Sequence, residues 1–186
     1  NESAFGVSPV AERAMRDAIK DLAWYNDPEN HDLRESLAKH HAVQPSEVAI
    51  AAGIDDLLGL VVRAFMESDQ VAVASLGAYP TFVYHIDGFG CRLSTTPYRD
   101  GKNDLDALSE LVQDDQVRVV YLSNPDNPTG TWHTASEIET FIERLPGHCV
   151  FILDEAYAEF APDDALPPIQ PLHPQVIRMR TFSKAH

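Results

Sequence analysis

The segment Phe151-Ile152-Leu153-Asp154-Glu155-Ala156-Tyr157 decides the fold that we expect for this chain. It reads as a short apolar strand that ends at a carboxylate, with a phenol three residues later. A run that is apolar on both faces is typical of a strand buried between two layers. A second segment, from Val176 onward, indicates another strand that leads into a hydroxyl and an amine at Ser183 and Lys184.

Similar runs elsewhere predict the rest of the sheet. The expected strands are Val48 to Ala52, Val71 to Ala74, Cys91 to Ser94, Val117 to Leu122, Cys149 to Leu153 and Val176 to Arg180. The expected helices are Pro9 to Leu22, Asp32 to His41, Gly53 to Phe65, Thr81 to Phe89, Asp104 to Val112 and Thr134 to Arg144. Strands that alternate with helices predict an α/β fold with three α-β-α layers, a mostly parallel sheet having helices on both faces.

The helix patterns also predict caps and buried side chains. Ser8-Pro9 indicates a helix start, with an N-cap serine and a proline at the first helical position. Thr134 and Glu137 form a capping-box pair. The second helix is expected to bury Leu33 and Leu37. The third is expected to bury a broad face made of Leu57, Leu58, Leu60, Val61, Val62, Ala64 and Phe65.

Ligands of parallel α/β sheets bind at the carboxyl ends of the strands, where this chain carries polar groups. An acid (Asp154), a phenol (Tyr157), a hydroxyl (Ser183) and an amine (Lys184) lie there. This set suits pyridoxal phosphate, which needs an amine for its aldehyde, an acid for its ring nitrogen and donors for its phenolate and phosphate. The structural alternatives are a solvated surface lysine, an aspartate that caps backbone amides and an amphipathic core tyrosine.

Other features fit the same cofactor. The first amides of a helix bind anions, so Gly53-Ile54-Asp55 would hold the phosphate, unless the side chains of Asp55 and Asp56 point toward it. Asn127 lies in an Asn-Pro-Thr-Gly turn and would donate to the phenolate oxygen. Phe82 would stack on the pyridine face. An ordinary turn and ordinary core packing are the alternatives for these two.

The composition argues against several classes of partner. The chain of 186 residues carries 14 Lys and Arg against 29 Asp and Glu, a formal net charge of −15. This charge disfavours nucleic acids and anionic membranes, and no apolar run reaches the roughly 18 residues of a membrane span. Cys91 and Cys149 lie in or beside apolar runs, which favours free buried thiols and a cytoplasmic protein. The histidines lack metal-ligand spacing, so we predict no metal.

The chain stops at His186, two residues after Lys184. A nucleophile in the last turn would have nothing to cover its site, so we expect a piece of a longer protein. We divide it into an N-terminal arm and helix region, residues 1–30, and a cofactor-binding large domain, residues 31–186, without a C-terminal small domain.

Seven short motifs occur in a fixed order along nearly the whole chain. They are Asn1-Glu2 with Phe5 to Pro9, Tyr25 to Leu33, Ala52 to Asp56, Tyr79 to Phe82, Asn124 to Gly130, Asp154 to Tyr157 and Arg180 to His186. On these motifs the chain resembles the fold-type I pyridoxal-phosphate aminotransferases of class I/II, and most closely their histidinol-phosphate branch. The resemblance implies an amino-acid biosynthesis enzyme that moves an amino group between histidinol phosphate, or a related imidazole or aromatic amino acid, and a 2-oxo acid.

The resemblance also implies residue roles. Lys184 would form a Schiff base with the cofactor and later move a proton, and Asp154 would hold the ring nitrogen. The remaining ring contacts would come from Asn127, Tyr157 and Phe82.

The phosphate contacts implied by the resemblance come from the amides of Ile54 and Asp55, after Gly53, and from the Ser183 hydroxyl. Tyr25 would reach the phosphate of the neighbouring subunit's cofactor, which makes the active form a homodimer. Ile54 departs from the family, which prefers a small residue there, so only its backbone can help.

The family's further phosphate-binding and substrate-binding arginines lie beyond the lysine, where this chain has ended. Two alternatives therefore stay open. One is a decarboxylase or lyase of the same fold, such as a threonine-phosphate decarboxylase. The other is a non-catalytic cofactor-binding module.

Overall fold

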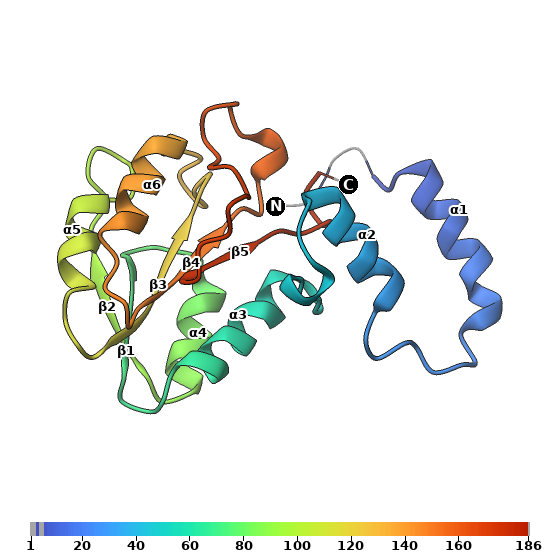
Figure 1. Ribbon diagram of the computed structural model, residues 1–186, viewed down its shortest axis with the longest axis horizontal. Coiled ribbons are helices and arrows are strands. Elements are labelled where there is room, and N and C mark those ends of the chain that lie inside the picture. Colours follow the sequence, from blue (N-terminus) through green and yellow to red (C-terminus); the bar gives the residue numbers. More distant parts are fainter. Residues whose placement is uncertain (1–2, 4–5, 186) are drawn as a thin grey trace. The chain divides into compact units, whose positions relative to one another are not determined.

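The computed structural model describes residue 3 and residues 6–185 (Figure 1). The chain divides into two compact units, one of Asn1–Ile50 with Phe182–His186 and one of Ala51–Thr181. The predicted division at residue 30 stays a prediction. Within the described residues, no helix has the length and apolar character needed to cross a membrane.

The larger unit contains one parallel sheet of five strands in the order β2-β1-β3-β4-β5. The strands are β1 (Val71–Ser75), β2 (Arg92–Thr96), β3 (Val117–Ser123), β4 (Val150–Asp154) and β5 (Val176–Met179). Every pairing is parallel, so all carboxyl ends lie at one edge of the sheet. The predicted parallel α/β sheet is confirmed.

Helices cover both faces of this sheet (Figure 1). They are α3 (Gly53–Phe65), α4 (Pro80–Gly88), α5 (Leu105–Leu111) and α6 (Ala135–Glu143), and a short 3-10 turn, η3 (Ala158–Phe160), follows β4. Side chains of α3 and α4 share one core cluster with Tyr121 and Ile152, and those of α5 and α6 share the other with Val120 and Phe151. The three predicted α-β-α layers are therefore confirmed.

The α3 helix buries a narrower face than its sequence predicts. Its buried apolar side chains are Ile54, Leu58, Val61 and Val62. Leu60, Ala64 and Phe65 are exposed, contrary to the prediction. Only one side of a surface helix can face the sheet, so the remaining apolar residues point to solvent. The capping box of Thr134 and Glu137 at the start of α6 is confirmed.

The smaller unit contains α1 (Pro9–Ala18), η1 (Ile19–Asp21), α2 (His31–His41) and η2 (Pro45–Glu47). The predicted start of α1 is confirmed, although the Ser8 side chain makes no capping hydrogen bond. In α2 the buried residue is Ala38, whereas Leu33 is exposed and Leu37 half-buried, so the predicted burial of Leu33 is wrong. Sequence periodicity identifies an apolar face but not whether a neighbour covers it.

The predicted strand at Val48 to Ala52 is wrong. This segment follows η2 directly and has no regular secondary structure. The Gly53 amide donates to the Ala51 carbonyl at 2.8 Å, which turns the chain sharply into α3. A strand needs a hydrogen-bonded neighbour, whereas the amides of Val48 and Ala52 donate to Pro45 and to the Asp56 side chain.

Candidate active site

Polar side chains of the larger unit gather at the carboxyl edge of the sheet. In the strand register, Ser123 at the end of β3 pairs with Asp154 at the end of β4, and Asp154 pairs with Met179 of β5. Asp154 is only 4% exposed. The predicted position of this carboxylate, at the end of a buried strand, is confirmed.

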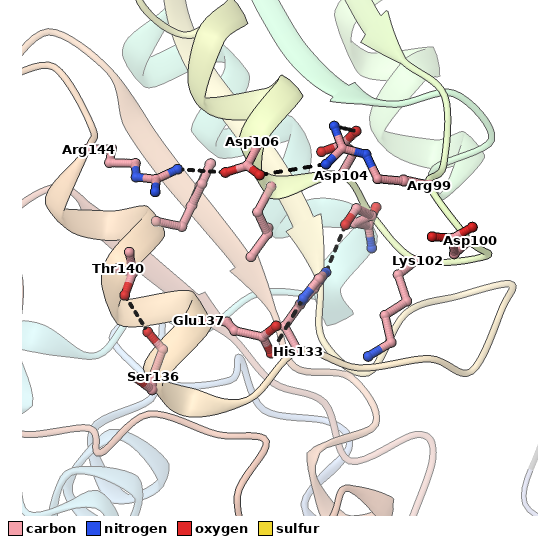
Figure 2. Close-up of a pocket in the computed structure, with 13 residues that line it drawn as sticks. Arg99, Asp100, Lys102, Asp104, Asp106, His133, Ser136, Glu137, Thr140 and Arg144 are labelled. Carbon is pink, nitrogen blue, oxygen red and sulfur yellow. Dashed lines mark hydrogen bonds and ion pairs between the residues drawn. The ribbon is translucent and has the colours of Figure 1, made fainter.

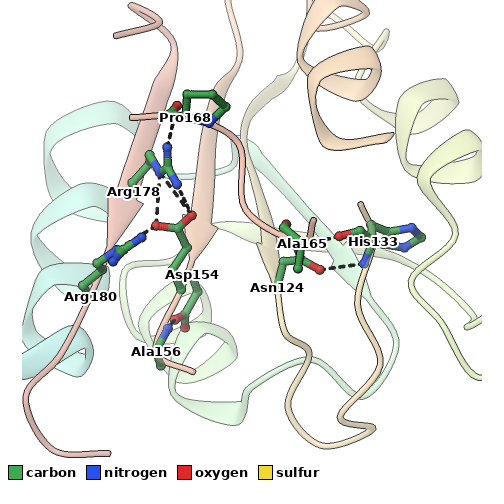
Figure 3. A network of polar contacts seen from close by, with 9 residues as sticks. Asn124, His133, Asp154, Ala156, Ala165, Pro168, Arg178 and Arg180 are labelled. Atoms are coloured by element: carbon green, nitrogen blue, oxygen red, sulfur yellow. Dashed lines mark hydrogen bonds and ion pairs between the residues drawn. The ribbon is translucent and has the colours of Figure 1, made fainter. Parts of the chain in front are cut away.

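Two neutral donors hold the Asp154 carboxylate. The Tyr121 hydroxyl donates to Oδ2 at 2.7 Å, and the Ala156 amide donates to Oδ1 at 2.9 Å (Figure 3 shows the second contact). Burial raises the pKa of Asp154, these two hydrogen bonds lower it, and the nearby negative charges of Glu155 and Asp55 raise it again. A carboxylate surrounded in this way would be stabilised by a cation.

Phe82 is fully buried and lies against Tyr121. The two rings are stacked, with centroids 4.8 Å apart and an interplanar angle of 17°. The structure thus shows Phe82 as a support for the tyrosine that binds Asp154. The predicted contact of Phe82 with a cofactor ring stays a prediction.

Glu155, the residue after Asp154, is completely buried and paired with Arg178 and Arg180. Both of its carboxylate oxygens lie 3.1 Å from Nε of Arg178, and Oε2 also lies 3.1 Å from Nε of Arg180. Its amide donates to the Met179 carbonyl at 2.9 Å. These contacts tie the end of β4 to β5, so they fix the backbone directly after Asp154.

The loop after β3 carries Asn127, which is half-buried. Its amide donates to the Ser123 hydroxyl at 3.1 Å. The carboxylate of Asp126 is buried and accepts hydrogen bonds from Ser123 at 3.0 Å, Asn103 at 3.0 Å and the Thr129 hydroxyl at 2.7 Å. Asp126 therefore fixes the turn that presents Asn127 at the edge of the sheet.

Asn124, at the start of this loop, is fully buried (Figure 3). Its side-chain amide donates to the carbonyls of His133 and Ala165 at 3.0 and 2.8 Å, and its Oδ1 accepts from the His133 amide at 2.8 Å. These three bonds join the ends of the loop to the segment after β4. The loop that contains Asn127 is therefore fixed both before and after this residue.

The start of α3 has the local geometry expected of an anion-binding turn. Gly53 has a φ of +84°, a conformation that favours glycine. Oδ2 of Asp56 accepts from the Ala52 amide at 3.3 Å, so this carboxylate folds back as a cap. The first amides of the helix have no intrahelical partners and can donate to an anion.

A histidine of α4 supports the same turn. Nε2 of His85 donates to the Asp55 carbonyl at 2.8 Å. Its ring packs on Gly59, where a Cβ atom would lie 2.6 Å from the imidazole. The Asp55 side chain lies 3.5 Å from the Tyr79 hydroxyl. Close contact between α3 and α4 therefore requires the glycine and orients the first turn of α3.

The other predicted site residues divide between the two units. Tyr157 follows β4 in the larger unit and is half-buried. Ser183, Lys184 and Tyr25 belong to the smaller unit, and Tyr25 is fully exposed. Their predicted contacts with a cofactor stay predictions.

A cavity of about 390 Å³ lies elsewhere in the larger unit, between α5 and α6 (Figure 2). Ion pairs occupy much of its wall, with Arg99 2.6 Å from Asp104 and Arg144 2.8 Å from Asp106. His133 donates from Nε2 to the Asn103 carbonyl at 2.8 Å. None of the predicted site residues lines this cavity, so it is distinct from the sheet edge that carries Asp154.

Sequence reasoning missed Tyr121, Asp126 and Glu155, which hold the site together. Tyr121 has a polar tip inside an otherwise apolar run, a signal that a buried partner is needed. Asp126 and Glu155 each adjoin a predicted site residue. Their partners Asn103 and Arg178 are distant in the sequence, so no local pattern identifies them.

Comparison with known proteins identifies a family. A family model for aminotransferase class I and II matches residues 1–186. The chain is 35% identical to histidinol-phosphate aminotransferase 2 of Pseudomonas fluorescens and 36% identical to the histidinol-phosphate aminotransferase of Brevibacillus brevis. These alignments cover 100% of this chain and 51% and 52% of the two proteins. The chain thus spans about half the length of these relatives.

Solved structures show the same relationship. The histidinol-phosphate aminotransferase from Sinorhizobium meliloti in complex with pyridoxal-5'-phosphate matches with a TM-score of 0.96 and 50% identity, over 99% of this chain and 51% of that chain. L-threonine-O-3-phosphate decarboxylase from Porphyromonas gingivalis matches over 96% of this chain and 55% of that one, with a TM-score of 0.80 at 17% identity, which shows a shared fold alone. Since the family model matches from the first residue to the last, the chain belongs to the aminotransferase class I and II family.

Proposed function

We propose that the complete protein is a pyridoxal-phosphate-dependent aminotransferase. It would move an amino group between histidinol phosphate, or a related imidazole or aromatic amino acid, and a 2-oxo acid, as one step of amino-acid biosynthesis. The observation that carries the proposal is the buried Asp154 carboxylate at the end of β4. Support comes from the family match and from 50% identity to a histidinol-phosphate aminotransferase solved with pyridoxal-5'-phosphate.

The residues at the sheet edge fit this cofactor. Asp154 lies in surroundings that favour a cation, as described above, and a protonated pyridine nitrogen supplies one. Asn127 and Tyr157 would donate to the phenolate oxygen, and Phe82 would contact the ring. The amides after Gly53 offer donors for a phosphate, and the folded-back carboxylate of Asp56 removes one source of repulsion.

Different groups of the chain would then bind the cofactor and move the proton. When bound, pyridoxal phosphate supplies an electron sink for the substrate's α-carbon. The Lys184 amine would hold the cofactor covalently and move the proton at that α-carbon. The Ser183 hydroxyl and the amides of Ile54 and Asp55 would bind the phosphate and so orient the ring.

We also propose a homodimer in which Tyr25 reaches the neighbouring subunit's cofactor phosphate. Support comes from the surface of the smaller unit, where α1 buries none of its residues. Several large apolar residues are exposed between residue 7 and the α1–α2 connection. They are Val7, Val10, Met15, Ile19, Leu22, Trp24 and Tyr25. Exposed apolar residues in this number are typical of an interaction surface, and a second copy would cover them.

We propose a cytoplasmic location for the protein. Cys91 and Cys149 are both buried and neither is in a disulfide, as the sequence predicted. Burial raises the pKa of both thiols, to about 12 for Cys149, which makes them poor nucleophiles. Reduced structural cysteines are typical of a reducing compartment.

The test of the proposed activity uses the full-length protein with pyridoxal phosphate. Histidinol phosphate and a 2-oxo acid are supplied, and both amino-group transfer and release of carbon dioxide are measured, the latter also with phosphothreonine. Transfer without carbon dioxide supports the proposal. Carbon dioxide as the main product would establish a decarboxylase instead, and cofactor binding without any turnover of amino acids would establish a non-catalytic module.

A further inference from the structure

We propose that Tyr121 is a positioning residue for the cofactor. Its hydroxyl fixes the orientation of the Asp154 carboxylate and favours the ionised form that a protonated ring nitrogen requires. The inference rests on the proposed function, because it concerns the group that Asp154 would hold. Tyr121 itself would touch neither cofactor nor substrate, and it would act through Asp154.

The contact between the two side chains is short and shielded from water. The hydroxyl lies 2.7 Å from Oδ2 of Asp154, and the two residues are 1% and 4% exposed. The Ala156 amide occupies Oδ1 at 2.9 Å. Each carboxylate oxygen therefore has one fixed donor, which sets the rotation of the group, and keeps capacity for one more.

The phenol is held rigidly enough to act as a fixed donor. Tyr121 is in β3, opposite Ile152 of β4, and the strand ends two residues later beside Asp154. Its ring is stacked on Phe82, which is fully buried. Strand pairing fixes the backbone and stacking fixes the ring, so the hydroxyl points at the carboxylate without an entropic cost at the time of binding.

Negative charges near Asp154 oppose its ionisation, and the Tyr121 donor acts against them. Asp55 of α3 and Glu155 of the same strand end oppose ionisation of Asp154, and Tyr79 also lies within its electrostatic reach. Burial and the negative charges of Asp154 and Asp126 raise the pKa of Tyr121 well above its usual value. The phenol therefore stays protonated and keeps donating wherever the carboxylate is ionised.

Substitution of Tyr121 by phenylalanine isolates the hydroxyl. Tyr121→Phe keeps the ring that stacks on Phe82 and removes only the donor to Asp154. We expect the pKa of Asp154 in the full-length, cofactor-free protein to rise by about one to two units, the size of one hydrogen bond to a charged group. Carbon NMR of the labelled aspartate carboxyls, assigned with Asp154→Asn, measures this shift. An unchanged titration overturns the proposal.

A second variant strengthens the same hydrogen bond and keeps both the ring and its hydroxyl. Replacement of Tyr121 by a fluorinated tyrosine makes the phenol more acidic and the donor stronger, so the pKa of Asp154 should fall. The matched control is Tyr98→Phe, which removes a half-buried hydroxyl that lies 3.4 Å from Asp126 rather than from Asp154. The pKa of Asp154 should be unchanged in this control. If Tyr98→Phe shifts that pKa as much as Tyr121→Phe does, the effect comes from packing and the proposal is overturned.

Measurements with the cofactor separate this proposal from the proposed function. In full-length protein loaded with pyridoxal phosphate labelled at the ring nitrogen, Tyr121→Phe should lower the pKa of that nitrogen. Tyr121→Phe should also weaken cofactor binding, and this loss should be smaller when Asp154 is already replaced by Asn. A protein that binds no pyridoxal phosphate refutes the proposed function. A protein that binds it with the same ring-nitrogen pKa in both forms refutes the role of Tyr121 alone.

Discussion

Asp126 and Thr129 are joined twice across one turn: Oδ2 of Asp126 accepts from the Thr129 hydroxyl at 2.7 Å and from its amide at 3.2 Å. The other oxygen of the same buried carboxylate accepts from Ser123 and Asn103. The acidic side chain thus serves as the common acceptor for groups from three parts of the chain. The half-buried Asn127 lies between the two joined residues, so its position depends on this carboxylate.

Removal of this acceptor should destabilise the turn. We predict that Asp126→Ala lowers the free energy of unfolding by about 1–3 kcal/mol, because several buried donors lose their partner. The same variant should release pyridoxal phosphate faster, since the turn that contains Asn127 loses the acceptor for Ser123 and Thr129. Urea titration and cofactor release from the full-length protein measure these effects. The control is Asp87→Ala at an exposed site of α4, and equal losses in both variants would contradict the prediction.

The pH dependence of stability should reveal the buried state of Asp154. Burial raises its pKa above the usual 3.8. A carboxyl with a raised folded-state pKa binds its proton more tightly in the folded protein, so its stabilising contribution is present in acid and is lost as pH rises through that pKa. We predict that cofactor-free wild type loses stability relative to Asp154→Asn as pH rises from 3.8 toward neutrality.

For an exposed aspartate, we expect the free energy of unfolding to change with pH in the opposite direction. Arg144 lowers the pKa of Asp106, so wild type should gain stability relative to Asp106→Asn as pH rises. Urea unfolding of the three proteins over the same pH series measures both slopes. Parallel curves for wild type and Asp154→Asn would be inconsistent with a buried, raised-pKa carboxyl.

Covalent attachment of the cofactor should depend on Lys184. We predict that borohydride reduction of the full-length protein with pyridoxal phosphate adds the mass of one cofactor to the peptide that contains Lys184, because the amine is the nucleophile for the aldehyde. Lys184→Ala should abolish this addition, whereas Lys102→Ala, at an exposed lysine of the α5–α6 cavity, should not. Retained addition at another lysine would show that Lys184 is misassigned.

Mixed dimers can establish whether Tyr25 acts across subunits. Tyr25→Phe and Lys184→Ala should each reduce or abolish aminotransferase activity when present in every subunit. In a dimer with one subunit of each kind, an intersubunit Tyr25 leaves one site with both wild-type residues. We therefore predict that co-refolding the two variants restores activity well above that of either alone. No restoration, with mixed dimers demonstrated by differential tagging, would indicate that Tyr25 acts within its own subunit.

Local sequence patterns were sufficient to predict the layered parallel fold and the position of Asp154. Apolar runs such as Val117 to Leu122 identify strands buried on both faces, and the acid after Leu153 follows one of them directly. The Thr134 and Glu137 box likewise depends on residues within one turn. Such features can be predicted because strand periodicity and capping involve neighbours in the sequence.

Only the tertiary structure decided what surrounds that carboxylate. Tyr121 reaches Asp154 because β3 and β4 are neighbours in register, and Arg178 reaches Glu155 because β5 lies beside β4. The predicted strand at Val48 to Ala52 and the predicted burial of Leu33 were wrong because each depends on a neighbour that local sequence does not identify. An amino-acid pattern determines which surfaces are apolar or polar, whereas the packing of the whole sheet determines which of those surfaces meet.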